Sequence, residues 1–152
     1  MSLKTDIIFV RALRSNDELM EQLPAGDVYN TTIAMPEQDA ENAPLPYIIV
    51  TYDGMQNEGF TKDNSYEGDT DHVQISIEVT AENREQLGDL MQAVRTTVVS
   101  FFDGYTPPAD PKAEDLTQLI PEHYTLSASA VGYDPDKPCY YQTLNYNCDT
   151  NP

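Results

Sequence analysis

The sequence is poor in cysteine, in basic residues and in long apolar stretches. Two of its 152 residues are cysteines, and 8 Lys or Arg stand against 26 Asp or Glu, which gives a formal charge of -18. Binding to nucleic-acid phosphates or to anionic membranes depends on cations, so this balance argues against both. No apolar run reaches the roughly 20 residues of a membrane-spanning helix. We therefore expect neither specific nucleic-acid binding nor membrane insertion.

The two cysteines, Cys139 and Cys148, are expected to be free thiols. Both fall on or beside one predicted strand, which keeps their side chains too far apart for a disulfide. Free thiols are typical of a reducing compartment. The first residues, Met1 to Asp6, lack the basic start and the apolar middle of a secretory signal, and we expect a cytoplasmic protein.

The clearest pattern in the chain is a strand that leads into a helix between Asp71 and Phe102. Over residues 73–79, Val and Ile alternate with polar residues, which is typical of a strand with one buried face. From Asn83 the apolar residues recur at spacings of three and four, which predicts an amphipathic helix over 83–102. We expect Thr80 or Asn83 to cap this helix.

The rest of the chain predicts further helices and strands. Apolar spacing predicts an N-terminal helix over 3–13 and a short helical piece over 17–23. β-branched or alternating residues predict strands over 28–33, 47–50, 124–133 and 139–146. This order predicts an α+β fold, a two-layer sandwich whose mainly antiparallel sheet has about four to five strands. The N-terminal helix and the helix over 83–102 should pack on one face of the sheet.

We expect a single domain over residues 1–152, because this length supports a hydrophobic core. Two flexible acidic excursions are predicted, at 54–71 and 105–121. The first connects two strands as an enlarged hairpin loop. The second is rich in proline and includes a short helix expected over 113–119.

The sequence suggests no reactive centre. His72 and His123 are the two histidines, and neither stands in a catalytic motif, so we interpret both as surface residues. The spacing of cysteine and histidine gives no zinc site, and the glycines are scattered rather than grouped in a phosphate loop. We therefore expect no catalytic residues, no enzyme activity and no cofactor.

One acidic loop resembles a metal site in part. Over residues 63–71 oxygen-bearing side chains recur around a glycine at the sixth position, as in a calcium loop. The twelfth position is Gln74 instead of a bidentate glutamate, and no predicted helix precedes the loop. We therefore favour a solvated hairpin tip, with a hydrolase or a calcium-dependent enzyme that uses this cluster as the alternative. The candidate ligands would be Asp63, Glu67, Asp69 and Asp71.

Tyrosines crowd the last predicted strand at Tyr140, Tyr141 and Tyr146. Tyrosine combines apolar area with a polar tip, so these residues suit either packing within the sheet or a protein interface. Both interpretations remain open. Our interface hypothesis joins them with Phe60 from the first excursion.

In its order of elements, the chain resembles the tail-completion family of tailed phages and prophages, also called tail-terminator or head-to-tail joining proteins. The resemblance rests on a helical N-terminus, the segment 43–48 (APLPYI), a polar excursion, the strand over 73–79 and the helix that opens with 82–87 (ENREQL). It covers about residues 3–102 and continues loosely through the final hairpin. The segment 105–121 is longer than the family leads us to expect.

The resemblance implies a structural virion protein. Its partners would be copies of itself in a ring, a hexamer, together with tail-tube and head-connector proteins. DNA would pass through the ring, and an acidic lumen would keep phosphates from sticking. The location implied is the bacterial host cytoplasm during assembly and then the tail or neck of the virion. The alternative is a small acidic protein-binding module or a nucleic-acid-mimicking inhibitor, which would stay monomeric and bind a cationic protein.

Overall fold

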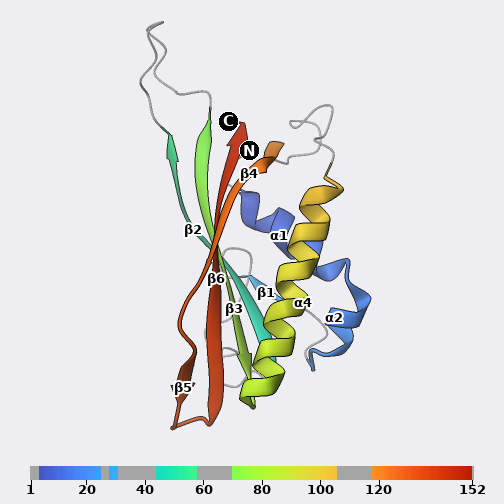
Figure 1. The fold of residues 1–152 in the computed structure, drawn as a ribbon, viewed down its shortest axis with the longest axis vertical. Coiled ribbons are helices and arrows are strands. Elements are labelled where there is room, and N and C mark those ends of the chain that lie inside the picture. Colours follow the sequence, from blue (N-terminus) through green and yellow to red (C-terminus); the bar gives the residue numbers. More distant parts are fainter. Residues whose placement is uncertain (1–3, 25–27, 31–43, 58–69, 106–117, 152) are drawn as a thin grey trace, which may run out of the picture.

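The computed structural model describes residues 4–24, 28–30, 44–57, 70–105 and 118–151. These residues form the predicted α+β fold, with helices on one side of a mixed, mostly antiparallel sheet (Figure 1). The helices are α1 (Thr5–Arg14), α2 (Asp17–Glu21) and α4 (Arg84–Asp103). The strands are β1 (Tyr29–Asn30), β2 (Tyr47–Asn57), β3 (Asp71–Ala81), β4 (Gln118–Ala128), β5 (Gly132–Asp134) and β6 (Cys139–Asn151).

Within the described residues the sheet has six strands, more than the sequence predicts. Its order is β1-β2-β3-β6-β4, and β5 also pairs with β6. The first pair, β1 and β2, is parallel, and the other pairs are antiparallel. Of the strand predicted over 28–33, the structure shows β1, and residues 31–33 lie outside the described part.

The strand predicted over 124–133 is divided into β4 and β5. Between them, Ser129 keeps one backbone hydrogen bond to Thr143, and side-chain hydrogen bonds take the place of the others. Thr143 N donates to Ser129 Oγ at 3.0 Å, and Gln142 Nε2 donates to the Ser129 carbonyl oxygen at 2.8 Å. The chain therefore leaves the regular ladder after Ala128 and returns to it at Gly132.

Several strands extend into polar sequence beyond the predicted bounds. β2 continues to Asn57 through backbone pairing with β3, and β6 continues to Asn151 through pairing with β3 and β4, because such pairing forms between polar residues as well as apolar ones. β4 begins at Gln118, so the helix predicted over 113–119 is wrong at 118 and 119. The rest of that predicted helix lies outside the described residues.

The two acidic excursions are consequently shorter than predicted. Residues 54–57 and Asp71 belong to β2 and β3, and residues 118–121 belong to β4. Most of the remainder, 58–69 and 106–117, lies outside the described residues.

The core lies between the helices and the sheet. The residues of β3 that face the helices have 0% exposure, and they are Val73, Ile75, Ile77 and Val79. Of the apolar residues that form the predicted stripe of α4, all but the partly buried Phe101 are buried, and they are Leu87, Leu90, Met91, Val94, Val98 and Phe102. Burial of these two matching apolar surfaces is the main stabilising contribution.

The start of α4 is fixed by a pair of side chains. Asn83 Oδ1 accepts a hydrogen bond from Gln86 N at 2.8 Å, and Gln86 Oε1 accepts one from Glu82 N at 3.1 Å. This arrangement resembles a capping box and satisfies backbone donors that the first turn leaves free. Asn83 is therefore the cap, and Thr80 is not. None of the described helices is long and apolar enough to span a membrane.

Candidate interaction surface

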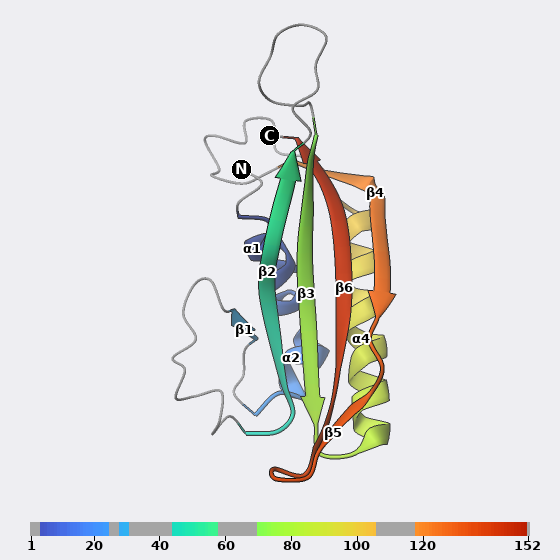
Figure 2. The ribbon, with the colours of Figure 1, turned by 90° about the vertical axis from the view of Figure 1, so that its left-hand side faces the viewer.

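One side of the sheet carries no described helix. Figure 2 looks onto this side, with α1, α2 and α4 behind the strands. We call it the open face. The side chains of β3 and β6 on this face alternate with those that point to the helices. They are His72, Gln74, Ser76 and Glu78 of β3, and Tyr141, Thr143, Asn145, Asn147 and Asp149 of β6.

Along β3 and β6, the open face has few charges for such an acidic chain. Within β3 and β6, its carboxylates are Glu78 and Asp149. Many exposed acids lie instead on or beside α2 and α4, at Asp17, Glu18, Glu21, Glu82, Glu85, Asp89 and Asp103. Because like charges repel, two copies of this chain would approach with less repulsion through the open face than through the helical layer.

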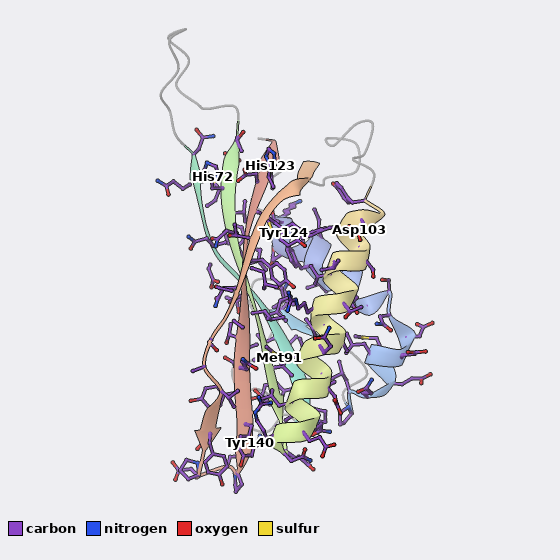
Figure 3. All side chains as sticks on the ribbon, viewed as in Figure 1. His72, Met91, Asp103, His123, Tyr124 and Tyr140 are labelled. Atoms are coloured by element: carbon purple, nitrogen blue, oxygen red, sulfur yellow. The ribbon has the colours of Figure 1, made fainter. Side chains whose placement is uncertain are left out.

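Two histidines and one aspartate meet at one end of the open face. His72 Nδ1 lies 2.5 Å from Asp149 Oδ1, and His123 Nδ1 lies 3.6 Å from Asp149 Oδ2. Figure 3 shows both imidazoles at this end of the sheet. The contacts join β3, β6 and β4 across three neighbouring strands. Thr125 and Asn147 line the same surface pocket.

The exposure of this cluster indicates its chemistry. The side chain of His72 is 48% exposed, that of His123 63% and that of Asp149 26%. A general base or nucleophile usually works where water is excluded, because electrostatic interactions are stronger there. The geometry therefore favours a solvated contact between strands over a catalytic centre.

Both histidines lie at the surface, as predicted, but no pattern in the sequence indicates that they lie close together. His72 is the register partner of Asp149 in the β3–β6 ladder. The predicted last strand ended at Tyr146, so Asp149 had no place in it. If the last strand had been predicted as far as Asp149, its pairing with the strand over 73–79 would have placed Asp149 near His72.

Three tyrosines lie at the opposite end of the sheet, near the turn between β5 and β6, and Tyr141 is the one on the open face. Tyr141 is 41% exposed, and its ring lies over Gly132. A Cβ atom at Gly132 would lie 2.2 Å from Tyr141 Cζ, so this close approach requires glycine. The rings of Tyr133 and Tyr140 lie 4.9 Å apart. Glu78 lines the same surface pocket as Tyr141, and burial raises the pKa of its carboxyl group.

The structure separates the four residues of the interface hypothesis. Tyr146 is 1% exposed, and its assignment to an interface is wrong because its ring packs inside the core against Phe9. Tyr140 is half-buried and packs against the core, whereas Tyr141 lies on the open face. Phe60 lies outside the described residues.

Of the candidate calcium ligands, the structure describes Asp71. Its side chain is buried, and Asp71 Oδ1 accepts a hydrogen bond from Asn57 Nδ2 at 2.7 Å. Asp63, Glu67 and Asp69 lie outside the described residues. Within the part of the chain that is described, no three His, Cys, Asp or Glu side chains are arranged to hold a metal ion.

Both cysteines are free, as predicted, and both are buried. Burial raises the pKa of the Cys148 thiol to about 12, and the neighbouring Asp149 contributes in the same direction. Burial also raises the pKa of Cys139. Since the thiolate is the reactive form, neither thiol suits nucleophilic chemistry at neutral pH.

No family model and no curated protein matches this chain.

Proposed function

We propose that this protein is a non-enzymatic structural subunit of a tailed phage or prophage, which assembles with copies of itself into a tail-completion ring. The ring would join the tail tube to the head connector. This proposal accounts for the order of elements on which the family resemblance rests. It also accounts for a sheet that packs its helices on one side and leaves the other side open.

The observation that carries the proposal is the segregation of charge. The chain has a formal charge of -18, yet Glu78 and Asp149 are the carboxylates that β3 and β6 place on the open face. A protein that works alone gains nothing from a weakly charged surface along β3 and β6. A subunit that must meet identical acidic copies does, because every misplaced carboxylate would add repulsion at the contact.

The proposal predicts self-association that becomes stronger with salt. At 0.1 M ionic strength, charges are screened beyond about 10 Å, which reduces repulsion between acidic copies. Sedimentation velocity at a series of protein concentrations, in low and moderate salt, measures this directly. We expect a larger, discrete species to grow with both variables.

Two results would contradict the proposal. One is a monomer at every concentration and salt. The other is an assembly that dissociates as salt rises. A persistent monomer that binds a basic protein such as lysozyme, and releases it in salt, would instead support the acidic-module alternative. The exposed acids on α2 and α4 are the residues that would bind such a partner.

A further inference from the structure

The sheet has two edges at which part of a strand lacks a neighbour among the described residues. On one side, the outer edge of β4 has none. On the other side, β1 pairs with β2 at Ile49 and Val50, so the later part of β2, from Tyr52 to Gln56, has none. Figure 2 shows β4 and β2 at opposite edges of the sheet. Such edges expose backbone N–H and C=O groups that can pair with another chain.

These two open edges lie at the same level of the sheet. Along the ladders from β4 through β6 and β3 to β2, Leu126 lies in the same row as Tyr52. Tyr124 lies in the same row as Met55. A copy placed beside the first without a large shift along the strands would therefore bring one open edge against the other.

The strand directions also match. β2, β3, β6 and β4 follow one another in the sheet and alternate in direction. Because their number is even, β4 of one copy runs antiparallel to β2 of a neighbour that keeps the same orientation. A row of such copies therefore has no mismatch in strand direction. Antiparallel ladders are also slightly more stable than parallel ones.

The last part of β4, residues 124–128, does not protect its edge, whereas Pro121 and Glu122 stand earlier in the strand. Natural edge strands are commonly blunted by lysine, other charges or proline. From Tyr124 to Tyr133 the chain has no charged residue and no proline, although 22% of all residues are charged. The half-buried side chains of Tyr124 and Leu126 point to the helix side. On β2, Tyr52 and the 40%-exposed Met55 point to the same side.

We propose that β4 of one copy pairs antiparallel with the Tyr52–Gln56 part of β2 of the next copy, so that the sheet continues from subunit to subunit. The two surfaces differ, which makes the interface heterologous and allows the chain of copies to close into a ring. The contact would join apolar side chains on the helix side and polar ones on the open face. This inference rests on the proposed function, since it names the surfaces by which the subunits meet.

Cross-linking tests which edges meet. Thr51→Cys and Ser127→Cys place thiols on the open face, one at each edge and in the same row. The native thiols are buried. A short bismaleimide should join the two variants when they are mixed, and should join neither variant to itself. A chain with both substitutions should give a ladder of products that ends at the number of subunits in the ring.

Each other outcome of this test has a distinct meaning. If Ser127→Cys alone cross-links to itself, then β4 pairs with β4 in a two-fold dimer and the inference is wrong. If sedimentation shows assembly but the mixture does not cross-link, another surface forms the contact, and the proposed function survives without this inference. If the chain remains a monomer, both fail.

A backbone test is available at Leu126. Ser129 N donates to Thr143 O at 2.9 Å, so the N–H groups of odd-numbered residues in this part of β4 point toward β6. Those of Tyr124 and Leu126 therefore point outward, because successive residues alternate. Leu126→Pro removes an outward donor, whereas Leu126→Ala shortens the same side chain and keeps it.

We expect Leu126→Pro to weaken self-association on the order of tenfold more than Leu126→Ala, as measured by sedimentation. Circular dichroism checks that both variants fold, and if the proline variant does not, the cross-linking test decides alone. Equal association of two folded variants would contradict the proposed pairing.

Discussion

Tyr146 offers the sharpest test of how the core is packed, because it was predicted to lie at an interface and the structure places it in the interior. Its ring centroid lies 5.3 Å from that of Phe9, 6.5 Å from that of Phe102 and 6.3 Å from that of Tyr124. Its hydroxyl group is buried and has no hydrogen-bond partner among the described residues. Burial raises the pKa of this hydroxyl, so it stays protonated.

These contacts set the expected change in the free energy of unfolding for two variants of Tyr146. A buried polar group without a partner costs about 1–3 kcal/mol. Tyr146→Phe removes the hydroxyl and keeps the ring, so it should raise the free energy of unfolding by about 1 kcal/mol. In a domain of this size that is a rise of about 2–4 °C in Tm. Tyr146→Ala removes the ring as well and should cost about 3–5 kcal/mol, a large part of the total stability of about 5–15 kcal/mol.

Urea unfolding followed by circular dichroism measures both variants, and sedimentation shows whether assembly changes. The reasoning is refuted if Tyr146→Phe destabilises the fold by more than about 1 kcal/mol, since the hydroxyl would then make a valuable bond. It is also refuted if Tyr146→Ala leaves stability unchanged and abolishes assembly. That pair of results would return the residue to a surface.

Three further predictions concern the cap, the thiols and one carboxyl group. Asn83→Ala should lower stability by about 1 kcal/mol and Gln86→Ala by less, both measured by urea unfolding; no change in the first would contradict the observed cap. Cys139 and Cys148 should react with a thiol reagent in the unfolded chain but not in the native protein, since burial raises both pKa values. Glu78→Gln should raise Tm at pH 7. Burial raises the folded pKa of Glu78 above its unfolded value, so wild-type stability falls as pH rises through that range. The advantage of the variant should therefore vanish in acid, and a constant difference across pH would contradict this cause.

The residues of the histidine cluster come together through strand pairing that the sequence does not predict. Asp149 meets His72 because β6 pairs with β3 in one register, and it meets His123 because β4 pairs with β6 on the other side. None of these three residues belongs to a pattern that the sequence makes visible. Conversely, Tyr146 has the composition of an interface residue, and only packing against Phe9 and its neighbours shows that it is internal.

By itself, the sequence determined β3, α4, the free thiols and the α+β class, and it narrowed the cap of α4 to Thr80 or Asn83. Each of these features depends on the order of polar and apolar residues within one segment, or on a few residues, so local patterns of polarity suffice to predict it. The tertiary structure alone decided the polar ends of β2 and β6, the division of β4 from β5, the histidine cluster and the two open edges. Those features depend on backbone hydrogen bonds between distant segments, and such bonds form with little regard for which side chain each residue has.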